Sequence, residues 1–465
     1  MLISIDIGTT NVKAVAWNDE GHVVTTAERA NTTLTPEYGW SEQEPDRVFR
    51  HTQEVLEAVA PKKNKIRAVV FSAAMHGLVA LDKAGRPLTN FLLWSDLRAD
   101  SIAKQLRQDG QGMEIYRRTG VPIHAMSPLC KLIWLRKNQP AVFQNARKFL
   151  GIKEFLWHRL TGRYESDLSL ASATGLLNIW TNNWDEDALR LAGISAEQLP
   201  QLVSPSTTFP ATDMLPMLII GASDGALANI GSGATAPGQV AVTIGTSAAI
   251  RMVANEPLLD EKMRTFCYRL DEGRCIVGGA SNNGTNALEW LRRHIMQSEL
   301  DADAFANQAL SIQPGSDGLL FLPYLHGERA PLYDAAALGS FQGLSARHTH
   351  NNMVRAVMEG VLFNLKIIAE PLEARQPTLT LHAGGGFSKN QAWVQMLADI
   401  FQKPVWVNDE GADASASGAM QLARAVLGME QSPAQKGEGM IVPNLDHKAL
   451  YEHSLRKFSG LLRGY

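Results

Sequence analysis

The chain contains few cysteines. Three are present in 465 residues, Cys130, Cys267 and Cys275, and no two of them form a CxxC pair. This sparse, odd number argues against a disulfide-stabilised scaffold and is typical of reduced thiols in a cytosolic protein. An excess of charge of one sign is also missing, because 44 Lys and Arg residues face 47 Asp and Glu residues. Without a basic block or a strongly positive balance, we expect no binding to nucleic acid.

Long apolar segments are absent as well. No uninterrupted apolar stretch approaches the ~20 residues that a transmembrane helix needs. The first residues carry no basic segment, and Asp6 interrupts the apolar run there, so we expect no signal peptide. Together with the cysteine usage, this predicts a cytoplasmic protein. A length of 465 residues with 45% hydrophobic content is ample for two or three globular domains.

Short apolar strands alternate with longer helical patterns along the chain, and this alternation predicts an α/β fold. The opening residues 2–17, "LISIDIGTTNVKAVAW", indicate two strands joined by a turn at residues 8–11. A helical pattern follows over residues 45–60, and a further helix is expected over residues 390–401.

The opening design occurs twice. Residues 239–253, "QVAVTIGTSAAIRMV", again place Ile-Gly-Thr between two apolar strands, as residues 7–9 do. Two copies about half a chain apart predict two related halves. The small-residue segment "GSGATAPG" at residues 231–238 is the predicted boundary, which gives domains 1–234 and 235–465.

The first turn could bind phosphate. Backbone amides in a tight turn form an anion-binding concavity, Gly8 permits close approach, and Thr9 and Thr10 add hydroxyl donors. Asp6 could hold Mg²⁺ beside those phosphates. The alternative is a plain hairpin turn with a capped acid.

The second copy, at residues 245–247, could grip the nucleotide tail from the opposite side of a cleft. Three glycines at residues 384–386 end another strand and could lie against a base or ribose. The alternative interpretation of these glycines is a flexible connection between a strand and a helix. No GxxxxGK[ST] pattern is present, which excludes a P-loop.

Residues 221–225, "GASDG", match the GxSxG pattern of hydrolase nucleophile elbows. One hypothesis is therefore an α/β-hydrolase with Ser223 as nucleophile and His326 or His382 as base. The other makes Asp224 a general base that takes the proton from an attacking hydroxyl, with Ser223 in support.

Two further segments could bind a polyol. Met75 and His76 end a strand, and His76 could bond a hydroxyl. Trp94, Asp96 and Arg98 stand at a spacing of two, so in an extended segment all three would face one side. A structural histidine and a surface ion pair are the alternatives.

These motifs together resemble the FGGY carbohydrate kinases, the family that includes glycerol kinase, xylulokinase and gluconokinase. Residues 126–138, "MSPLCKLIWLRKN", are similar to the first family signature, and residues 339–359, "GSFQGLSARHTHNNMVRAVME", to the second. The elements "DIGTT", "AMHG", "SDG", "IGTS", "GERAP" and "GGG" follow in the family's order, so the resemblance covers nearly the whole chain.

The resemblance implies two ribonuclease-H-like, actin-type ATPase domains flanking a deep cleft, and transfer of phosphate from ATP, with Mg²⁺, to a sugar hydroxyl. It implies that Asp224 is the catalytic base and Asp6 the metal-associated acid, both facing the metal. Met75 and His76 would lie at the sugar, where Asp224 also acts. The implied nucleotide-binding residues are Thr9, Thr10, Asn11, Lys13, Gly245, Thr246, Gly284, Gly385, Gly386 and Asn390.

Within the family, the gluconokinase group resembles this chain most, through "RTGVPIHAMSPLCKLIWL", "GIKEFLW", "SDLSLASATGLLNI" and "ERAPLY". This implies phosphorylation of the 6-hydroxyl of D-gluconate, with xylulose or a related pentulose as alternative acceptors. A catalytically silent sugar-responsive regulator is a more distant alternative. Because gluconate is an anion, a cation should read its carboxylate, and Lys153 is the predicted residue with Arg98 in reserve. A homodimer is a further possibility that the sequence leaves open.

Overall fold

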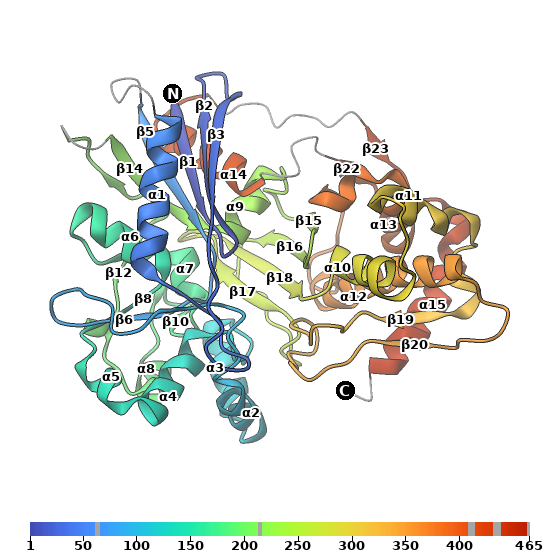
Figure 1. The fold of residues 1–465 in the computed structure, drawn as a ribbon, viewed down its shortest axis with the longest axis horizontal. Helices are drawn as coiled ribbons and strands as arrows, with labels where there is room; N and C mark the ends of the chain where they lie inside the picture. The colour runs from blue at the N-terminus through green and yellow to red at the C-terminus, as the bar shows by residue number, and fades with distance from the viewer. Residues whose placement is uncertain (61–65, 213–215, 408–413, 431–438, 463–465) are drawn as a thin grey trace.

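Two central β-sheets of the same topology organise the chain. The computed structural model describes residues 1–60, 66–212, 216–407, 414–430 and 439–462 (Figure 1). The first sheet has the order β13-β14-β5-β1-β2-β3. Its strands are β1 (Leu2–Ile7), β2 (Asn11–Trp17), β3 (Val23–Ala30), β5 (Ala68–Ala73), β13 (Thr208–Phe209) and β14 (Met217–Ser223).

The second sheet has the order β17-β18-β16-β15-β21-β22-β23. Its strands are β15 (Gln239–Ile244), β16 (Ala248–Ala254), β17 (Phe266–Arg269), β18 (Cys275–Ser281), β21 (Thr380–Gly384), β22 (Val405–Val407) and β23 (Met440–Ile441). In each sheet three antiparallel strands continue into two parallel ones, β3-β2-β1-β5-β14 in the first and β18-β16-β15-β21-β22 in the second. The prediction of two related α/β halves is confirmed.

Helices cover both faces of the first sheet, because its strands bury side chains on alternate sides. Helix α1 (Pro45–Val59) begins with proline at its first turn and packs Val48, Val55 and Val59 on one face, beside α6 (Ile152–Thr161). The opposite face carries α9 (Asp224–Gly231) and, from near the end of the chain, α14 (Ala414–Val426). Figure 1 shows α14 beside β1 and α9.

The second sheet packs against the longest helix, α12 (His350–Glu373), whose middle is buried almost all round. Helices α10 (Thr285–Trp290), α11 (Ala302–Asn307), α13 (Gln391–Phe401) and α15 (Lys448–Leu461) complete this half. The predicted helix at residues 390–401 is α13, and Asn390 caps it by accepting a hydrogen bond from Trp393 N–H. Among the described helices, none combines the length and apolar character of a membrane span.

A third cluster lies below the first sheet. It contains α2 (Asp100–Gln108), α3 (Gln111–Thr119), α4 (Pro128–Asn138), α5 (Pro140–Asn145) and α8 (Glu186–Ala192). Short paired strands connect it to the sheet: β4 (Glu42–Gln43) with β7 (Phe91–Leu92), β6 (Val79–Leu81) with β8 (Lys148–Leu150), β9 (Glu165–Asp167) with β12 (Gln201–Val203), and β10 (Leu177–Asn178) with β11 (Asn183–Trp184). The hairpin of β19 (Leu320–Leu322) and β20 (Ser340–Gln342) belongs to the second half.

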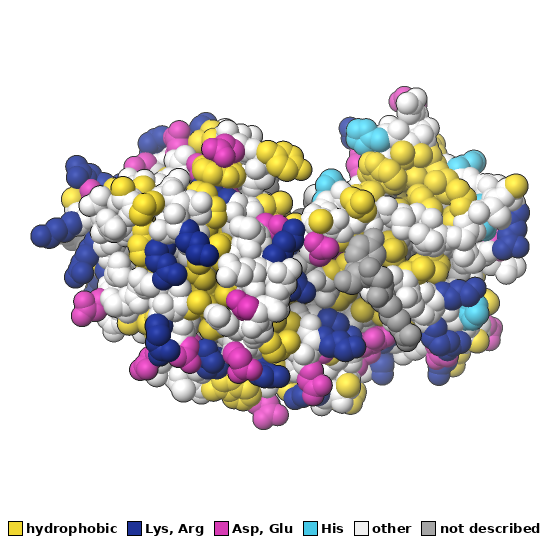
Figure 2. Space-filling view, turned by 90° about the horizontal axis from the view of Figure 1, so that it is seen from below, with side chains coloured by type: hydrophobic (Ala, Val, Ile, Leu, Met, Phe, Trp, Pro, Cys, Tyr) yellow, Lys and Arg dark blue, Asp and Glu magenta, His cyan; other side chains and the backbone are white. Residues whose placement is uncertain are grey.

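The two halves contact each other through backbone as well as side chains. Edge strand β17 reaches the first half, where Cys267 N–H donates to Gly120 O at 2.8 Å. The predicted domain boundary at 234/235 falls between α9 and β15 and stays a prediction. Seen from below, the surface narrows to a notch between two lobes (Figure 2).

Helices α9 and α14 cross very closely, and glycine makes this possible. A Cβ atom on Gly418 would lie 1.9 Å from the backbone oxygen of Leu227, and one on Gly231 would lie 1.9 Å from that of Ala414. Since α9 begins with Asp224, the crossing fixes the position of this carboxylate relative to the first sheet.

Gly418→Ala should therefore lower the thermal unfolding temperature, although alanine is the better helix former by about 1 kcal/mol. Overpacking of this kind costs about 1–3 kcal/mol, and here the obstacle is backbone that cannot rotate away. Gly460→Ala in α15 is the matched control, because nothing lies within 4 Å of its added Cβ. Circular dichroism melts should show Gly418→Ala below wild type and Gly460→Ala at or above it. Equal melting of both variants would contradict the close crossing.

Candidate active site

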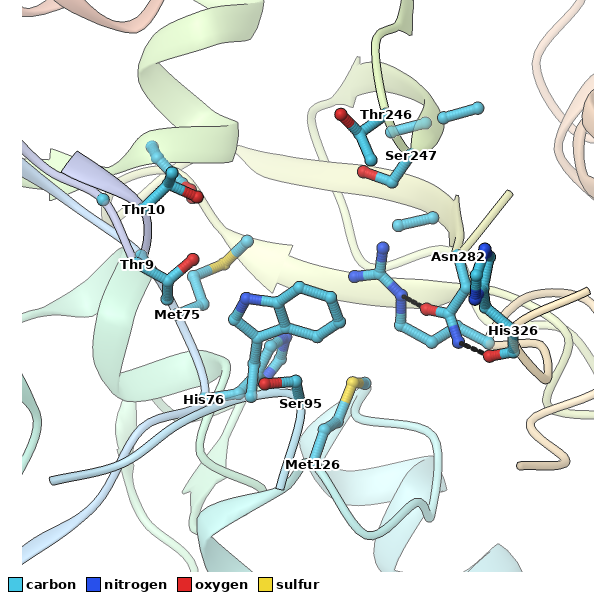
Figure 3. Close-up of a pocket in the computed structure, with 18 of the residues that line it drawn as sticks. Thr9, Thr10, Met75, His76, Ser95, Met126, Thr246, Ser247, Asn282 and His326 are labelled. Atoms are coloured by element: carbon cyan, nitrogen blue, oxygen red, sulfur yellow. Dashed lines mark hydrogen bonds between the residues drawn. The ribbon is translucent and has the colours of Figure 1, made fainter. Parts of the chain in front are cut away.

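A cavity of about 970 Å³ lies between the two halves (Figure 3). Its walls come from both strand turns that the sequence singled out, from the loops after β5 and β7, and from the loop that follows β19. The lining residues predicted from the sequence are Asp6, Thr9, Thr10, Asn11, Lys13, Met75, His76, Trp94, Asp224 and Thr246.

The first turn joins β1 to β2, and its backbone carbonyls are tied away from the cavity. Gly8 N–H donates to Asn11 O at 3.0 Å, while Asn31 donates its side-chain amide to Gly8 O and its backbone N–H to Thr10 O. Gln43 donates to Thr9 O at 2.5 Å. The Thr9 and Thr10 side chains are left on the cavity side, opposite Thr246 and Ser247 (Figure 3).

The second turn joins β15 to β16 and is supported from behind. Gly245 N–H donates to Ser247 O at 2.9 Å, and Thr285 N–H donates to Gly245 O at 2.7 Å. Gly284 packs directly against this turn, since a Cβ on it would lie 2.4 Å from Gly245 O. Gly284 is not among the cavity-lining residues, so the structure gives it a supporting place beside the turn.

The glycine run follows β21, next to the second turn. A Cβ on Gly385, whose φ is +90°, would lie 2.7 Å from Ile244 O, the residue that leads into Gly245. Asn390 donates its side-chain amide to Asp303 and Asn307. None of Gly385, Gly386 and Asn390 lines the cavity, and their contact with a nucleoside stays a prediction.

Two carboxylates face the cavity from the first half. Asp6, in β1, accepts hydrogen bonds from Ser72 Oγ at 2.6 Å and Ser415 Oγ at 3.2 Å. Asp224, at the start of α9, accepts from Gly225 N–H at 2.6 Å. Burial raises the pKa of Asp224 to about 6, the charge of Asp6 adds to the rise, and the Arg251 guanidinium opposes it. A carboxylate with this pKa is suited to accept a proton near neutral pH.

His76 is held neutral at the cavity wall. Its Nδ1 lies 2.8 Å from Ala173 O and its Nε2 lies 3.4 Å from Tyr268 Oη. Burial lowers the pKa of His76 to about 3. The backbone contact assigns the ring proton to Nδ1, so Nε2 is the acceptor that remains.

Lys131 was not predicted, although it stands out as a charge on an almost wholly buried helix, α4. Its Nζ donates to His76 O at 2.7 Å and to Leu93 O at 2.6 Å. These bonds tie together the two loops that carry His76 and Trp94. Burial lowers the pKa of Lys131 to about 7, against the attraction of Asp96.

The structure corrects the prediction for Asp96 and Arg98. The segment turns at Trp94 instead of remaining extended, so the spacing of two does not place all three side chains on one face. Trp94 lines the cavity, whereas Asp96 is fully buried and pairs with Arg98 at 2.8 Å. Arg98 also pairs with Glu42 and stacks over Trp40, and neither Asp96 nor Arg98 lines the cavity.

Lys153 is corrected as well. It lies in α6 with 1% of its side chain exposed, and its Nζ is 2.7 Å from Asp167 Oδ2. Asp167 caps α7 (Leu168–Ser172) and accepts from Ser169 Oγ, which in turn accepts from Ser223 N–H at 2.7 Å. The structure contradicts the predicted contact between Lys153 and a substrate carboxylate. The lysine is buried against Asp167 and does not line the cavity.

The hydrolase hypothesis fails at Ser223. This residue is 2% exposed, and its Oγ caps α9 by accepting from Ala226 N–H. His382 is engaged with Ser232 O at 3.0 Å. The GxSxG match therefore belongs to a helix cap and not to an exposed nucleophile.

Several cavity residues had no clear signal in the sequence, among them Arg251 of β16, Tyr268 of β17 and Arg329 of "GERAP". Arg329 donates from Nε to Asn282 Oδ1 at 2.8 Å and lies 4.7 Å from the Trp94 ring centroid. It therefore reaches across the cleft from the second half to the first. Its neighbour Glu328 is fully buried, and burial raises the pKa of Glu328 to about 7.

Known proteins resemble this chain in sequence and in fold. The gluconokinase of Bacillus subtilis (strain 168) is 39% identical over 445 residues, which cover 90% of this chain and 86% of that protein. The crystal structure of gluconate kinase from Lactobacillus acidophilus has a TM-score of 0.95 and 34% identity, and the match covers 100% of this chain and 97% of that one. Ligand-bound xylulose kinase from Lactobacillus acidophilus gives the same TM-score and identity, with 100% and 98% covered.

The family models divide the chain as its sheets do. The N-terminal domain model of the FGGY family of carbohydrate kinases matches residues 1–231, and the C-terminal domain model matches residues 240–426. Asp6, Asp224 and both hydroxyl-bearing turns line one cavity between these halves. The chain therefore belongs to the FGGY family of carbohydrate kinases.

Proposed function

We propose that this chain is a gluconokinase, which transfers the γ-phosphoryl group of ATP to the 6-hydroxyl of D-gluconate. The observation that carries the proposal is the position of Asp224, whose carboxylate faces a cavity flanked by two opposed turns rich in hydroxyl groups. Similarity to the Bacillus subtilis gluconokinase supports gluconate as the acceptor.

The nucleotide would enter with its phosphates between the turns. Thr9 and Thr10 on one side, and Thr246 and Ser247 on the other, can donate hydroxyl hydrogen bonds to phosphate oxygens. Lys13, which pairs in register with Asp6 across β1 and β2, also lines the cavity and can contribute positive charge there. We expect Asn11 and Gly245 to contribute through the turns, and Gly385, Gly386 and Asn390 to lie toward the adenosine.

The carboxylates present fit Mg²⁺ bound together with substrate. Among the described residues no group of three or more His, Cys, Asp or Glu side chains could hold a metal. Mg²⁺ usually takes one or two carboxylates and completes its sphere with water and substrate phosphates, and Asp6 and Asp224 supply such a pair. When bound, the ion neutralises charge on the phosphates.

The transfer then follows from the protein groups. Met75, His76 and Trp94 would hold the carbon chain, with His76 Nε2 accepting from a sugar hydroxyl. Asp224 would take the proton of the 6-hydroxyl as its oxygen attacks the γ-phosphorus in line, and ADP would leave. The hydroxyl donors of both turns would stabilise charge on the transferring group, which is the main task in phosphoryl transfer.

Two other functions are weaker. Xylulose or a related pentulose is the runner-up acceptor, and the similarity to the Lactobacillus acidophilus xylulose kinase keeps it under test. A silent sugar-responsive regulator would need neither Asp224 nor two intact turns, yet all of them line the cavity. ADP release from ATP, measured with gluconate, xylulose, glycerol and ribulose as acceptors, should give the highest kcat/KM for gluconate. A higher value for another sugar would reassign the substrate.

The pH dependence of kcat/KM should follow the ionisation of Asp224. Its raised pKa of about 6 means that the carboxyl already binds a proton at a pH where an ordinary aspartate is ionised. The protonated form cannot accept the hydroxyl proton, so kcat/KM should be level above about pH 7 and fall tenfold per unit below about pH 5.5. A profile that stays flat down to pH 4.5 would contradict this base.

A further inference from the structure

Arg251 is a half-buried cation in the cavity wall. Its Nε is buried and makes no hydrogen bond within the described chain, and its guanidinium forms no ion pair with any carboxylate that the structure describes. The contrast with two arginines whose side chains are buried is clear, since Arg98 pairs with Asp96 and Arg355 pairs with Glu359 at 2.7 Å. A partly desolvated charge that has no ion-pair partner is costly, so its retention in a cavity wall points to a ligand of opposite charge.

A second guanidinium strengthens the positive field. Arg329 lines the same cavity and likewise forms no ion pair with the described carboxylates. Its Nε donates to Asn282 Oδ1 and its Nη2 donates to Ser281 O. Burial lowers the pKa of Arg251, the charge of Asp224 opposes this, and the charge of Arg329 adds to the lowering. An anion lying against Arg251 would relieve both the repulsion and the desolvation.

The position of Arg251 favours the acceptor over the nucleotide. Residue 251 lies three residues into β16 from Ala248, about 10 Å along the strand from the end of the phosphate turn. Its Nε lies 3.3 Å from where a Cβ on Gly225 would stand, and Met75 Cε lies 3.1 Å from the same point. Arg251 is therefore beside Met75 and Asp224, on the side where the sugar is expected.

We propose that Arg251 binds the carboxylate of the sugar-acid acceptor, and that Arg329, stacked on Trp94, forms the adjoining wall of this subsite. The proposal rests on the proposed function, and it assigns to Arg251 the role predicted from the sequence for Lys153, which is to bind the carboxylate of gluconate. A guanidinium can grip a carboxylate through two parallel N–H donors, which a neutral acceptor such as xylulose cannot use.

Binding of D-gluconate and of its neutral amide, D-gluconamide, tests this directly. Calorimetry should show tighter binding of gluconate by the wild type. In Arg251→Met the gluconate Kd should rise about 10–150-fold, as expected for one lost charge-assisted hydrogen-bonding contact, whereas the gluconamide Kd should change less than about threefold. Arg251→Lys should recover part of the gluconate affinity, because it keeps the charge but not the fork.

Two further measurements separate other roles of Arg251. The ADP Kd should be unchanged in Arg251→Met, and a rise instead would place Arg251 at the phosphates. The melting temperature should stay level or increase, because the substitution removes a half-buried charge that forms no ion pair with the described carboxylates. A clear fall would mark Arg251 as structural.

The outcomes decide between this proposal and the one beneath it. If the wild type neither binds nor phosphorylates gluconate, the proposed function fails and the carboxylate subsite fails with it. If the wild type uses gluconate but Arg251→Met weakens gluconate and gluconamide equally, or weakens neither, the subsite alone is wrong.

Discussion

Asp224→Asn should lose about 10²–10⁴-fold in kcat, the usual range for a lost general base. The asparagine amide has nearly the same shape, so the contact with Gly225 N–H and the start of α9 should persist. What disappears is the ability to accept the proton of the attacking hydroxyl. Steady-state ADP release gives kcat, and calorimetry with ADP should show an unchanged Kd.

Ser223→Ala is the matched control, because Ser223 is the adjacent residue and only caps α9. Loss of an N-cap costs about 1 kcal/mol of stability, so the variant should melt earlier but keep most of its turnover. Turnover of Asp224→Asn within threefold of the wild type would remove Asp224 from the mechanism. An inactive Ser223→Ala variant, together with esterase activity in the wild type, would restore the hydrolase hypothesis.

Lys153→Met should destabilise the fold by about 3–5 kcal/mol, since it leaves the fully buried Asp167 without its cation. Denaturant unfolding gives this free energy. Activity should fall to a similar degree for every acceptor, because Asp167 acts through Ser169 on the backbone of Ser223, next to the base. This outcome is the opposite of a substrate-reading lysine.

The control for Lys153→Met is the double variant with Asp167→Asn. Removing both charges takes away the unpaired carboxylate, so the double variant should regain part of the lost stability, as a double-mutant cycle will show. If Lys153→Met keeps normal stability and loses activity with gluconate alone, Lys153 contacts the substrate carboxylate after all.

Much of the fold could be predicted from local patterns. The repeated strand–turn–strand design around Thr9 and Thr246 indicated two related halves, and both sheets show it. The turn residues, Asp6 and Asp224 stand at strand ends, where backbone direction alone places them at the edge of a sheet. These residues come together in one cavity because the two sheets face each other.

The misplaced residues share a physical reason. Charge alone suggests Lys153 and Arg98 as ligands of a substrate carboxylate, but charge does not reveal whether an ion-pair partner lies elsewhere in the chain. Asp167 and Glu42, which pair with them, are 14 and 56 residues away, and only the tertiary fold brings them together. The sequence does not single out Arg251 as a binding residue, for a related reason. It stands in an apolar strand, and only the three-dimensional structure shows that its Nε finds no hydrogen-bond partner among the described residues.

Phosphorus NMR of a competition between two acceptors identifies both the preferred sugar and the hydroxyl group that receives the phosphate. Equal concentrations of D-gluconate and D-xylulose are incubated with the enzyme, Mg²⁺ and limiting ATP. Nearly all transferred phosphate should appear as one ester whose chemical shift matches authentic 6-phosphogluconate and whose phosphorus couples to the two protons of C6, and Asp224→Asn should give almost none. A product dominated by xylulose phosphate, an ester on a secondary hydroxyl, or release of inorganic phosphate alone would contradict it.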